Sequence, residues 1–304
     1  MKKAILGALL SISIVLAACG QEAKGTAEET NVEPAVAETE NTEPEDAETE
    51  NAEEADAAEA NAGTDVTETA NEGETAEKEL TIYIVRHGKT FFNTTGQVQG
   101  FCDSPLTDTG IEQAEKVGKG LKDIPFTTAY CGELGRQSKT AELILAQNEN
   151  EVPSLVKNVG FNEWNYGGYE GGSNAAMWDP IFEKYGYTFD EEWTYYGEVY
   201  EILGDRGVAD AIAANDELQA AESYNEILAR AEGAMNQLVE ESLAAGGGNV
   251  LVVSSGSQIP TILEMYVPDD YNGESIGNCS VTILKYKDGA YTLESIGDSS
   301  YVED

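Results

Sequence analysis

The sequence predicts a layered α/β fold with a mostly parallel central sheet over residues 80–304. Two apolar runs, LTIYIV at 80–85 and NVLVV at 249–253, have the continuous hydrophobicity of strands that are buried on both faces. Stretches with helical spacing of apolar residues separate these runs, and such alternation is typical of α/β folds. Ligand-binding side chains in these folds lie at the carboxyl ends of the strands.

The helical stretches and two further strands complete this fold. Apolar residues recur at helical spacing around residues 111–121, 141–145 and 224–238. The third helix is expected to end before Gly246-Gly247-Gly248, because glycine is the preferred residue at a helix stop. Residues 279–286 and 291–296 read as two late strands joined by a turn at 287–289.

Residues 172–223 depart from this alternation. They are rich in aromatic and acidic residues, and Pro180 interrupts them. We predict that they form an inserted, mostly helical lid over the functional site rather than a separate domain. The domain boundaries expected from the sequence are therefore 1–19, 20–79 and 80–304, with an insert at 172–223.

Residues 1–19 are predicted to be a lipoprotein signal peptide. Lys2 and Lys3 precede the apolar run AILGALLSISIVLAA, which is too short to read as a membrane-spanning helix. The last four residues, LAAC, resemble a bacterial lipobox, which implies cleavage before Cys19 and attachment of lipid to its sulfur. An ordinary signal peptide with an incidental cysteine is the alternative. With a lipid on Cys19, the chain is expected to be extracytoplasmic and anchored to the cell membrane.

Residues 20–79 are predicted to be a disordered acidic linker. They contain 21 acidic and 2 basic residues and no aromatic residue, so they cannot bury enough apolar surface to offset chain entropy. The sequence AETEN occurs at 37–41 and again at 47–51, which indicates low complexity rather than a structural repeat. Binding of a cation or another ligand by this acidic segment is the alternative to a spacer.

The charge and cysteine content of residues 80–304 exclude several functions. These residues have 36 acidic and 13 basic side chains, whereas nucleic-acid binding requires a basic face. Cys102, Cys131 and Cys279 are an odd number, so they cannot all pair within the chain, and no pair has metal-ligand spacing. An anionic substrate would need a local cationic pocket in so acidic a domain.

The clearest chemical signal follows the first predicted strand, as Arg86-His87-Gly88-Lys89-Thr90. His87 is the only histidine of the chain. A strand that ends in this way brings an imidazole and a guanidinium to the mouth of a pocket, and a guanidinium matches phosphate oxygens bidentately. Gly88 allows a tight turn and close approach of a ligand.

Three segments resemble the histidine phosphatase superfamily, the phosphoglycerate mutase-like group, in the order that the family requires. They are RHGKTFFNTTGQVQGFCDSPLTDTG from residue 86, YCGELGRQSKTAELI at 130–144 and FNEWNYGGYEGG at 161–172. The resemblance implies a three-layer α/β/α sandwich. It also implies that His87 is a nucleophile, Arg136 a second phosphate-binding arginine and Glu163 the general acid.

The implied chemistry needs no cofactor and no metal. A neutral imidazole attacks phosphorus and forms a phosphohistidine, while Arg86, Arg136 and Asn93 stabilise the phosphoryl oxygens. Glu163 would protonate the leaving alkoxide and later accept a proton from water. For Thr90 and Asn93 the alternative to phosphate binding is a role in loop structure. Tyr166 matches a position near the substrate in the family, with a wall or core aromatic as the alternative.

The sequence departs from the family at Ser255. The family has a second histidine in a Ser-His-Gly-like turn after the later strand, and here the segment reads VLVVSSGSQIP. Serine can donate a hydrogen bond to a phosphoryl oxygen but carries no charge, and loss of one such contact costs about a hundredfold in rate. The chain would then be a slower enzyme, an enzyme that uses Ser255 with a group such as Lys89, or a protein that only binds.

Three functions remain open from the sequence. The first is an extracytoplasmic phosphomonoester hydrolase that forms phospho-His87 and acts on a small phosphorylated substrate. The second is a catalytically weak phosphate- or phosphosugar-binding lipoprotein. The third is a surface lipoprotein whose insert contacts a protein or a cell-wall polymer.

Overall fold

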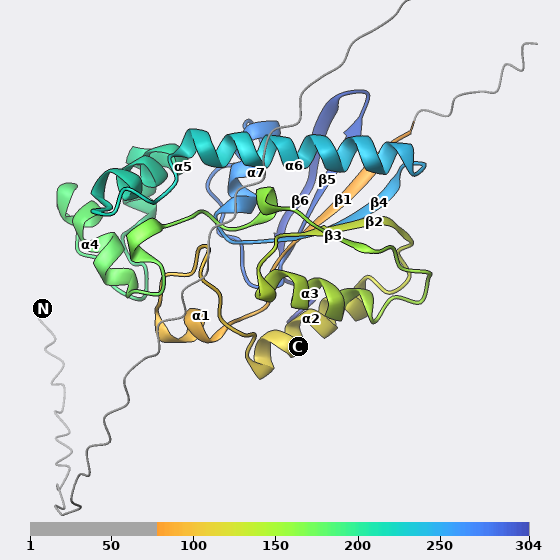
Figure 1. Cartoon of the computed structure of the whole chain (residues 1–304), viewed down its shortest axis with the longest axis horizontal. Helices are drawn as coiled ribbons and strands as arrows, with labels where there is room; N and C mark the ends of the chain where they lie inside the picture. Colours follow the sequence, from red (N-terminus) through yellow and green to blue (C-terminus); the bar gives the residue numbers. More distant parts are fainter. Residues whose placement is uncertain (1–77, 304) are drawn as a thin grey trace, which may run out of the picture. The chain divides into compact units, whose positions relative to one another are not determined.

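The computed structural model describes residues 78–303 (Figure 1). The predicted signal peptide at 1–19 and all of the predicted linker except Lys78 and Glu79 lie outside the described residues, as does residue 304. Within the part of the chain that is described, none of the helices combines the length and apolar character needed to cross a bilayer.

A six-stranded sheet in the order β3-β2-β4-β1-β5-β6 forms the centre of the fold. The strands are β1 (Leu80–Arg86), β2 (Phe126–Cys131), β3 (Leu155–Lys157), β4 (Gly248–Ser254), β5 (Val281–Lys287) and β6 (Ala290–Asp298). The first four strands of this order are parallel, and β5 and β6 are antiparallel additions at one edge. Arg86 pairs with Ser254, so β1 and β4 end side by side.

Helices cover both faces of the sheet (Figure 1). The bounds are α1 (Phe91–Thr95), α2 (Asp108–Gly120), α3 (Gly135–Leu145), α4 (Asn174–Lys184), α5 (Tyr196–Asn215), α6 (Tyr224–Ala244) and α7 (Gln258–Tyr266), with short 3₁₀ turns η1 (Val159–Phe161) and η2 (Gly167–Tyr169). α6 and α7 lie on one face and α2 and α3 on the other. The predicted fold class, α/β with a mostly parallel sheet, is confirmed.

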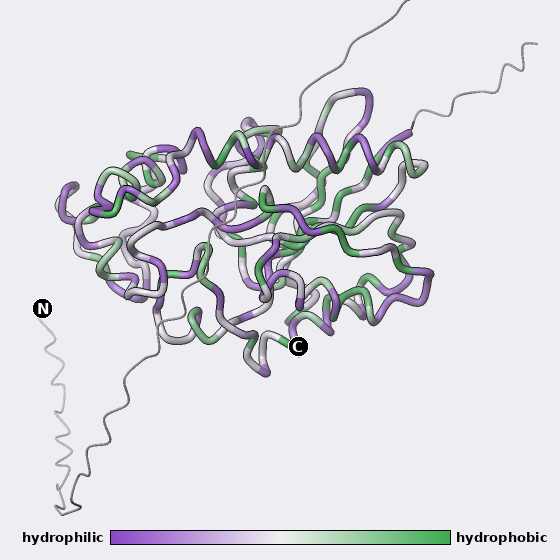
Figure 2. The backbone as a smooth tube through the Cα atoms, viewed as in Figure 1, coloured by the Kyte–Doolittle hydropathy of each residue, from purple (hydrophilic) through white to green (hydrophobic). Residues whose placement is uncertain are grey.

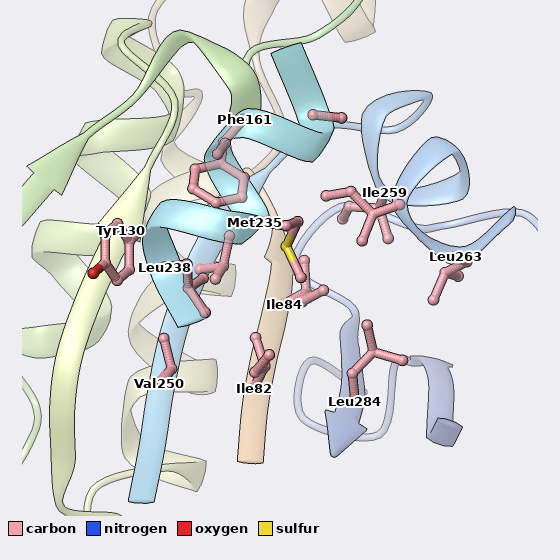
Figure 3. Packing of buried hydrophobic residues seen from close by; sticks show 14 of the residues in the cluster. Ile82, Ile84, Tyr130, Phe161, Met235, Leu238, Val250, Ile259, Leu263 and Leu284 are labelled. Carbon is pink, nitrogen blue, oxygen red and sulfur yellow. The ribbon is translucent and has the colours of Figure 1, made fainter. Parts of the chain in front are cut away.

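The core is divided by the alternation of side chains along each strand. Ile82 and Ile84 point toward α6 and α7, where they pack with Met235 and Leu238 (Figure 3). Val85 points to the opposite face, which α2 and α3 cover. Hydrophobic residues accordingly concentrate along the strands and the inner sides of the helices (Figure 2). Because both faces are covered, the parallel strands are continuously apolar.

The segment between η2 and α6 contains α4 and α5 and has its own apolar cluster, which includes Trp178, Phe182 and Phe189. α4 continues through Pro180, whereas α5 breaks at Gly204, whose φ of 60° and ψ of 179° are not helical. The break starts a second helical piece at Asp205. A lid function for this segment stays a prediction.

Candidate active site

His87 lies directly beyond β1, where its backbone N–H donates to Ser254 O at 3.0 Å. Its side chain is only 2% exposed. Burial, followed by the nearby guanidinium groups of Arg136 and Arg86, lowers the pKa of His87 well below its usual value, so the imidazole is neutral. Nδ1 lies 2.9 Å from Gly88 O, an acceptor, and therefore holds the proton. Nε2 keeps its lone pair, which is the form that a nucleophile needs.

The turn that carries His87 is fixed against α2 and α3. Gly88 N donates to the Thr140 hydroxyl at 3.0 Å on α3, and Lys89 N donates to Gln113 Oε1 at 3.1 Å on α2. A Cβ at Gly88 would lie 2.4 Å from Gly110 O. Two glycines therefore allow the backbone of the turn at His87 to touch the backbone at the start of α2.

The Arg86 guanidinium is partly buried at the end of β1. Its Nη1 donates to Ile276 O at 2.6 Å, and its Nε is buried without a protein acceptor. Burial lowers the pKa of Arg86, while the carboxylate of Glu163 raises it. The remaining N–H groups suit a phosphoryl group, because guanidinium binds phosphate through several parallel hydrogen bonds.

Most N–H groups of Arg136, on α3, are already used in hydrogen bonds to the protein. Its Nη1 donates to Cys102 O at 2.9 Å and to Asp103 Oδ1 at 3.1 Å, and its Nη2 donates to Gly100 O at 2.7 Å. Only Nε lacks a protein acceptor. Arg136 thus holds the 99–103 loop, although its charge acts on His87. A direct phosphate contact remains a prediction and would be made through Nε.

Glu163 follows η1 and is 6% exposed. The backbone N–H of Trp164 donates to its Oε1 at 2.9 Å, and Ser257 N donates to both carboxylate oxygens at 3.2 and 3.1 Å. Tyr166 O–H and the Ser257 hydroxyl are 3.1 Å apart. Burial, then Glu163, raises the pKa of Tyr166 well above its usual value, so the phenol is neutral. Ser257 thus positions both predicted residues.

Asn93 and Thr90 have different surroundings. Asn93 is exposed, and its Oδ1 accepts from Thr90 N and from Asn278 Nδ2, which leaves its own amide N–H groups for a ligand. Thr90 has no solvent exposure. Its hydroxyl accepts from Asn93 N and donates to Gln99 Oε1 at 2.9 Å. The hydroxyl caps α1, which favours the alternative of a role in loop structure, and a phosphate contact of Thr90 stays a prediction.

A cleft of about 880 Å³ opens beside these groups. Arg86, Asn93, Glu163 and Tyr166 line it, while His87, Arg136 and Ser255 are almost fully buried and do not. Across residues 78–303, no group of three or more histidine, cysteine, aspartate or glutamate side chains is arranged to hold a metal ion.

The geometry brings a neutral buried imidazole, two guanidinium groups and a fixed carboxylate together at the ends of parallel strands. The family model of the histidine phosphatase superfamily (branch 1) matches residues 82–299.

The chain belongs to the histidine phosphatase superfamily.

Three similar proteins each cover 74% of this chain. The crystal structure of a phosphoglycerate mutase from Bacillus anthracis str. Sterne is similar to this chain with a TM-score of 0.67. The two sequences are 38% identical, and the match covers 74% of this chain and 96% of the other chain. A probable phosphoglycerate mutase GpmB from Erwinia tasmaniensis is 26% identical over 74% of this chain and 96% of its own length. YhfR from Bacillus stearothermophilus, at 24% identity and a TM-score of 0.57 over 74% of this chain and 100% of its own, shares the fold.

Within this histidine phosphatase fold, Ser255 follows Ser254 at the end of β4, where the family resemblance implies a histidine. Ser255 is completely buried, and its hydroxyl accepts from Gln137 Nε2 at 2.8 Å. Gln137 also donates to Phe161 O at 2.9 Å, while its Oε1 has no hydrogen-bond partner. The serine is thus packed into a small polar network behind the cleft.

Three residues of the site were not found from the sequence. Arg230 on α6 pairs with Glu222 at 2.8 Å and donates to the carbonyl of Glu163 at 2.9 Å, so it holds the segment that carries Glu163. Asn278 donates to His87 O at 2.9 Å, and Ser257 donates through its backbone N–H. Arg230 and Asn278 lie outside the segments that resemble the family, and Ser257 lies in the segment after β4 but acts through its backbone N–H. Each of the three acts through contacts between positions far apart in the chain.

Proposed function

We propose that the chain is a phosphomonoester hydrolase that acts through a phosphohistidine at His87 on a small phosphorylated substrate. One observation carries the proposal: the His87 imidazole is neutral, its Nδ1 proton is donated to Gly88 O, and Nε2 is left as a nucleophile beside two guanidinium groups. Membership of the histidine phosphatase superfamily supports the same chemistry.

In the first step, the lone pair of His87 Nε2 forms an N–P bond as the P–O bond to the leaving group breaks. The guanidinium of Arg86 and the amide of Asn93 bind the phosphoryl oxygens, where fixed donors stabilise the transition state most. A proton held by Glu163 passes to the leaving oxygen, which departs as an alcohol.

In the second step, water attacks the phosphorus of phospho-His87. Glu163 accepts a proton from that water, the N–P bond breaks, and inorganic phosphate leaves with the imidazole neutral again. Ser257 N–H and the Arg230 contact to Glu163 O keep the carboxylate in one place through both steps. Two of the similar proteins are named as a phosphoglycerate mutase and a probable phosphoglycerate mutase. We propose hydrolysis here because the phosphates that a mutase needs lie inside the cell, whereas this chain is expected outside the membrane.

That location, outside the cytoplasmic membrane with a lipid on Cys19, is part of the proposal and rests on residues 1–19. Metabolic labelling with radioactive palmitate should mark the wild-type chain in the membrane fraction. Cys19→Ala should remove the label and release the chain into the medium or periplasm. Retention of the label by Cys19→Ala would contradict the lipid anchor.

The single histidine makes the test of the nucleophile sharp. A chain purified with a histidine-free tag is quenched during turnover of ³²P-labelled p-nitrophenyl phosphate, and acid-labile, alkali-stable label is measured. Any phosphohistidine can then lie only at His87. Label is expected in wild type and absent in His87→Ala, with circular dichroism to confirm that the variant folds.

Glu163→Gln is the matched variant for the second step. A nitrophenolate needs little protonation to leave, so the label should still form but decay more slowly than in wild type. If wild type forms no label and releases no phosphate, the hydrolase proposal fails and phosphate binding without turnover takes its place.

The position of Ser255 favours that binding function as the second candidate. An added imidazole at this site would collide with Gln137, because Ser255 is completely buried and bonded to it. Ser255→His is therefore made with Gln137→Ala, and its rate is compared with Gln137→Ala alone. A rate increase of about a hundredfold would show that the missing charge limits catalysis. An unchanged rate would show that the site works around serine.

A further inference from the structure

The cleft extends well beyond the groups that would bind phosphate. We call the part that Arg86, Asn93 and Glu163 line the phosphate end of the cleft. The part that Trp193, Tyr200 and Asp205 line is called the leaving-group end. A volume of about 880 Å³ lies in the upper part of the range for small-molecule sites. There is room for a phosphate together with a sizeable leaving group.

Outside the phosphate end, the charged residues that line this cleft are all acidic. Of the lining residues that the structure describes, Arg86 alone is basic, whereas Glu163, Glu191, Asp205 and Glu274 are acidic. A leaving group with its own carboxylate would meet repulsion from these acids. The same field attracts a positively charged leaving group.

Aromatic rings line the leaving-group end. Trp178, Trp193 and Tyr196 pack edge to face with centroids 5.2 to 5.7 Å apart, and Tyr200 stacks on Tyr196 at 6.0 Å. Trp193 is 36% exposed and has a φ of 59°, a strained conformation for a large side chain. Strain of this kind gathers at ligand sites. Electron-rich ring faces bind ammonium groups.

Asp205 is one of the buried acids of the cleft, and no lysine or arginine among residues 78–303 forms an ion pair with it. It is 5% exposed, and its carboxylate accepts a hydrogen bond from Tyr200 O–H at 3.2 Å and another from Tyr271. The neighbouring Arg206 instead lies over the Tyr224 ring at 4.7 Å and bonds Asn225 at 2.9 Å. A buried carboxylate without a cationic partner destabilises the fold, so a ligand that supplies the positive charge is the physical reason to keep it.

We propose that the substrate is a phosphomonoester whose leaving group carries a positive charge, such as an alkylammonium alcohol. The ammonium group lies among the aromatic rings beside Asp205 while the phosphoryl group faces Arg86. This inference rests on the proposed hydrolase function, because it names the substrate class of the same cleft.

The decisive comparison uses phosphocholine and its neutral isostere, 3,3-dimethylbutyl phosphate, in which carbon replaces the charged nitrogen. We expect kcat/KM for phosphocholine to be at least about tenfold higher, although the isostere is the more hydrophobic of the two. 3-Phosphoglycerate, with an anionic leaving group, should be the poorest of the three.

Variants separate the charge effect from general damage. Asp205→Asn should reduce the preference for phosphocholine, meaning the ratio of kcat/KM for phosphocholine to kcat/KM for the isostere, at least fivefold. Trp193→Ala should also reduce the preference, and Trp193→Phe should restore most of it. Glu198→Gln removes the same charge from an exposed position of α5 that does not line the cleft, and it should leave the preference unchanged.

Failure of this inference and failure of the hydrolase proposal give different results. Equal rates on phosphocholine and the isostere, or a preference for 3-phosphoglycerate, would overturn the cation site while p-nitrophenyl phosphate is still hydrolysed. If no phosphomonoester is hydrolysed, the hydrolase proposal fails. Titration calorimetry of wild type with phosphocholine and the isostere then decides the inference, and equal affinities would refute it.

Discussion

At the phosphate end of the cleft, the functional groups are held by the backbone at the ends of β1 and β4. At the leaving-group end, they are held by an aromatic cluster in the α4–α5 segment. His87 is anchored through Ser254 O and Gly88 O, and Glu163 through two backbone N–H groups. Asp205, in contrast, follows the break in α5 at Gly204 and accepts from the phenols of Tyr200 and Tyr271.

We infer that the phosphate end serves the reaction itself, whereas the leaving-group end serves the choice of substrate. Backbone anchors on a sheet fix atoms closely, which phosphoryl transfer needs. A cluster of side chains on a helical segment can change without disturbing that geometry. We therefore expect variants at the phosphate end to change the rate on every substrate, and variants at the leaving-group end to change the choice among substrates.

The largest effect is expected for Arg86→Lys. A lysine cannot reproduce the parallel hydrogen bonds of the guanidinium, so kcat on p-nitrophenyl phosphate should fall about a hundredfold. Arg206→Lys is the matched control, because Arg206 does not line the cleft, and it should stay within about twofold. Steady-state kinetics measures both. An Arg86→Lys enzyme with more than half of the wild-type rate would contradict a phosphate contact.

Arg230→Ala should affect the phosphate end indirectly, through the segment that carries Glu163. Its loss leaves Glu222 without its partner and releases the segment that carries Glu163, so the free energy of unfolding should fall by about 3 kcal/mol and kcat about tenfold. Lys285→Ala breaks the Lys285–Glu294 pair, in which both side chains are about half exposed, and should cost less than about 1 kcal/mol. Urea unfolding and kinetics distinguish them. Equal decreases in the free energy of unfolding would show that the Arg230–Glu222 pair contributes no more than an exposed ion pair.

Asp205→Asn should stabilise the protein in a pH-dependent way. Burial, Glu264 and Glu163 raise the pKa of Asp205 to about 6, while hydrogen bonds from Tyr200 and Tyr271 oppose this. The folded state then disfavours the charged form, so the cost is absent below about pH 4, grows up to about pH 6 and is complete above it.

The size of this effect follows from the same pKa. A rise from about 4 to about 6 corresponds to roughly 3 kcal/mol, so Asp205→Asn should unfold at a higher urea concentration at pH 8 and show no gain at pH 4. Glu198→Gln serves as the control at both values. A stability gain that is equal at pH 4 and pH 8 would mean that charge is not its cause.

Thr90→Val should give the smallest effect. Loss of the cap of α1 and of the bond to Gln99 should lower the free energy of unfolding by about 1 kcal/mol. KM for p-nitrophenyl phosphate should change less than twofold, because the hydroxyl does not line the cleft. Thr90→Ser should restore the stability. A large rise in KM without a change in stability would support a phosphate contact of Thr90.

Much of the sheet could be predicted because β1 and β4 are buried on both faces, which forces continuous apolar runs. β2, with the sequence FTTAYC, was missed, since its two threonines are half-buried and interrupt the apolar run. α7 was missed as well. It begins almost at once after the glycine turn, and Pro260 lies in its first turn.

The phosphate end could be predicted to the extent that its side chains lie in motifs. The motifs contain Arg86, His87 and Glu163, which the structure brings close together. A helix-capping threonine and a phosphate-binding threonine look alike in a sequence, so the motif could not decide between the two roles of Thr90. The leaving-group end gave no signal. Asp205 is one of 57 acidic residues, and nothing in the sequence around it shows that it is buried in the cleft among aromatic rings.

The direct contact between Gly88 and Gly110 joins the nucleophile turn to the start of α2 without any side chain between them. Because the two backbone segments touch directly, we expect neither to open to solvent without displacing the other. The amides of both segments should therefore exchange with deuterated solvent at one common, slow rate. A substitution at Gly110, on a helix outside the cleft, should accelerate exchange at the turn that carries His87.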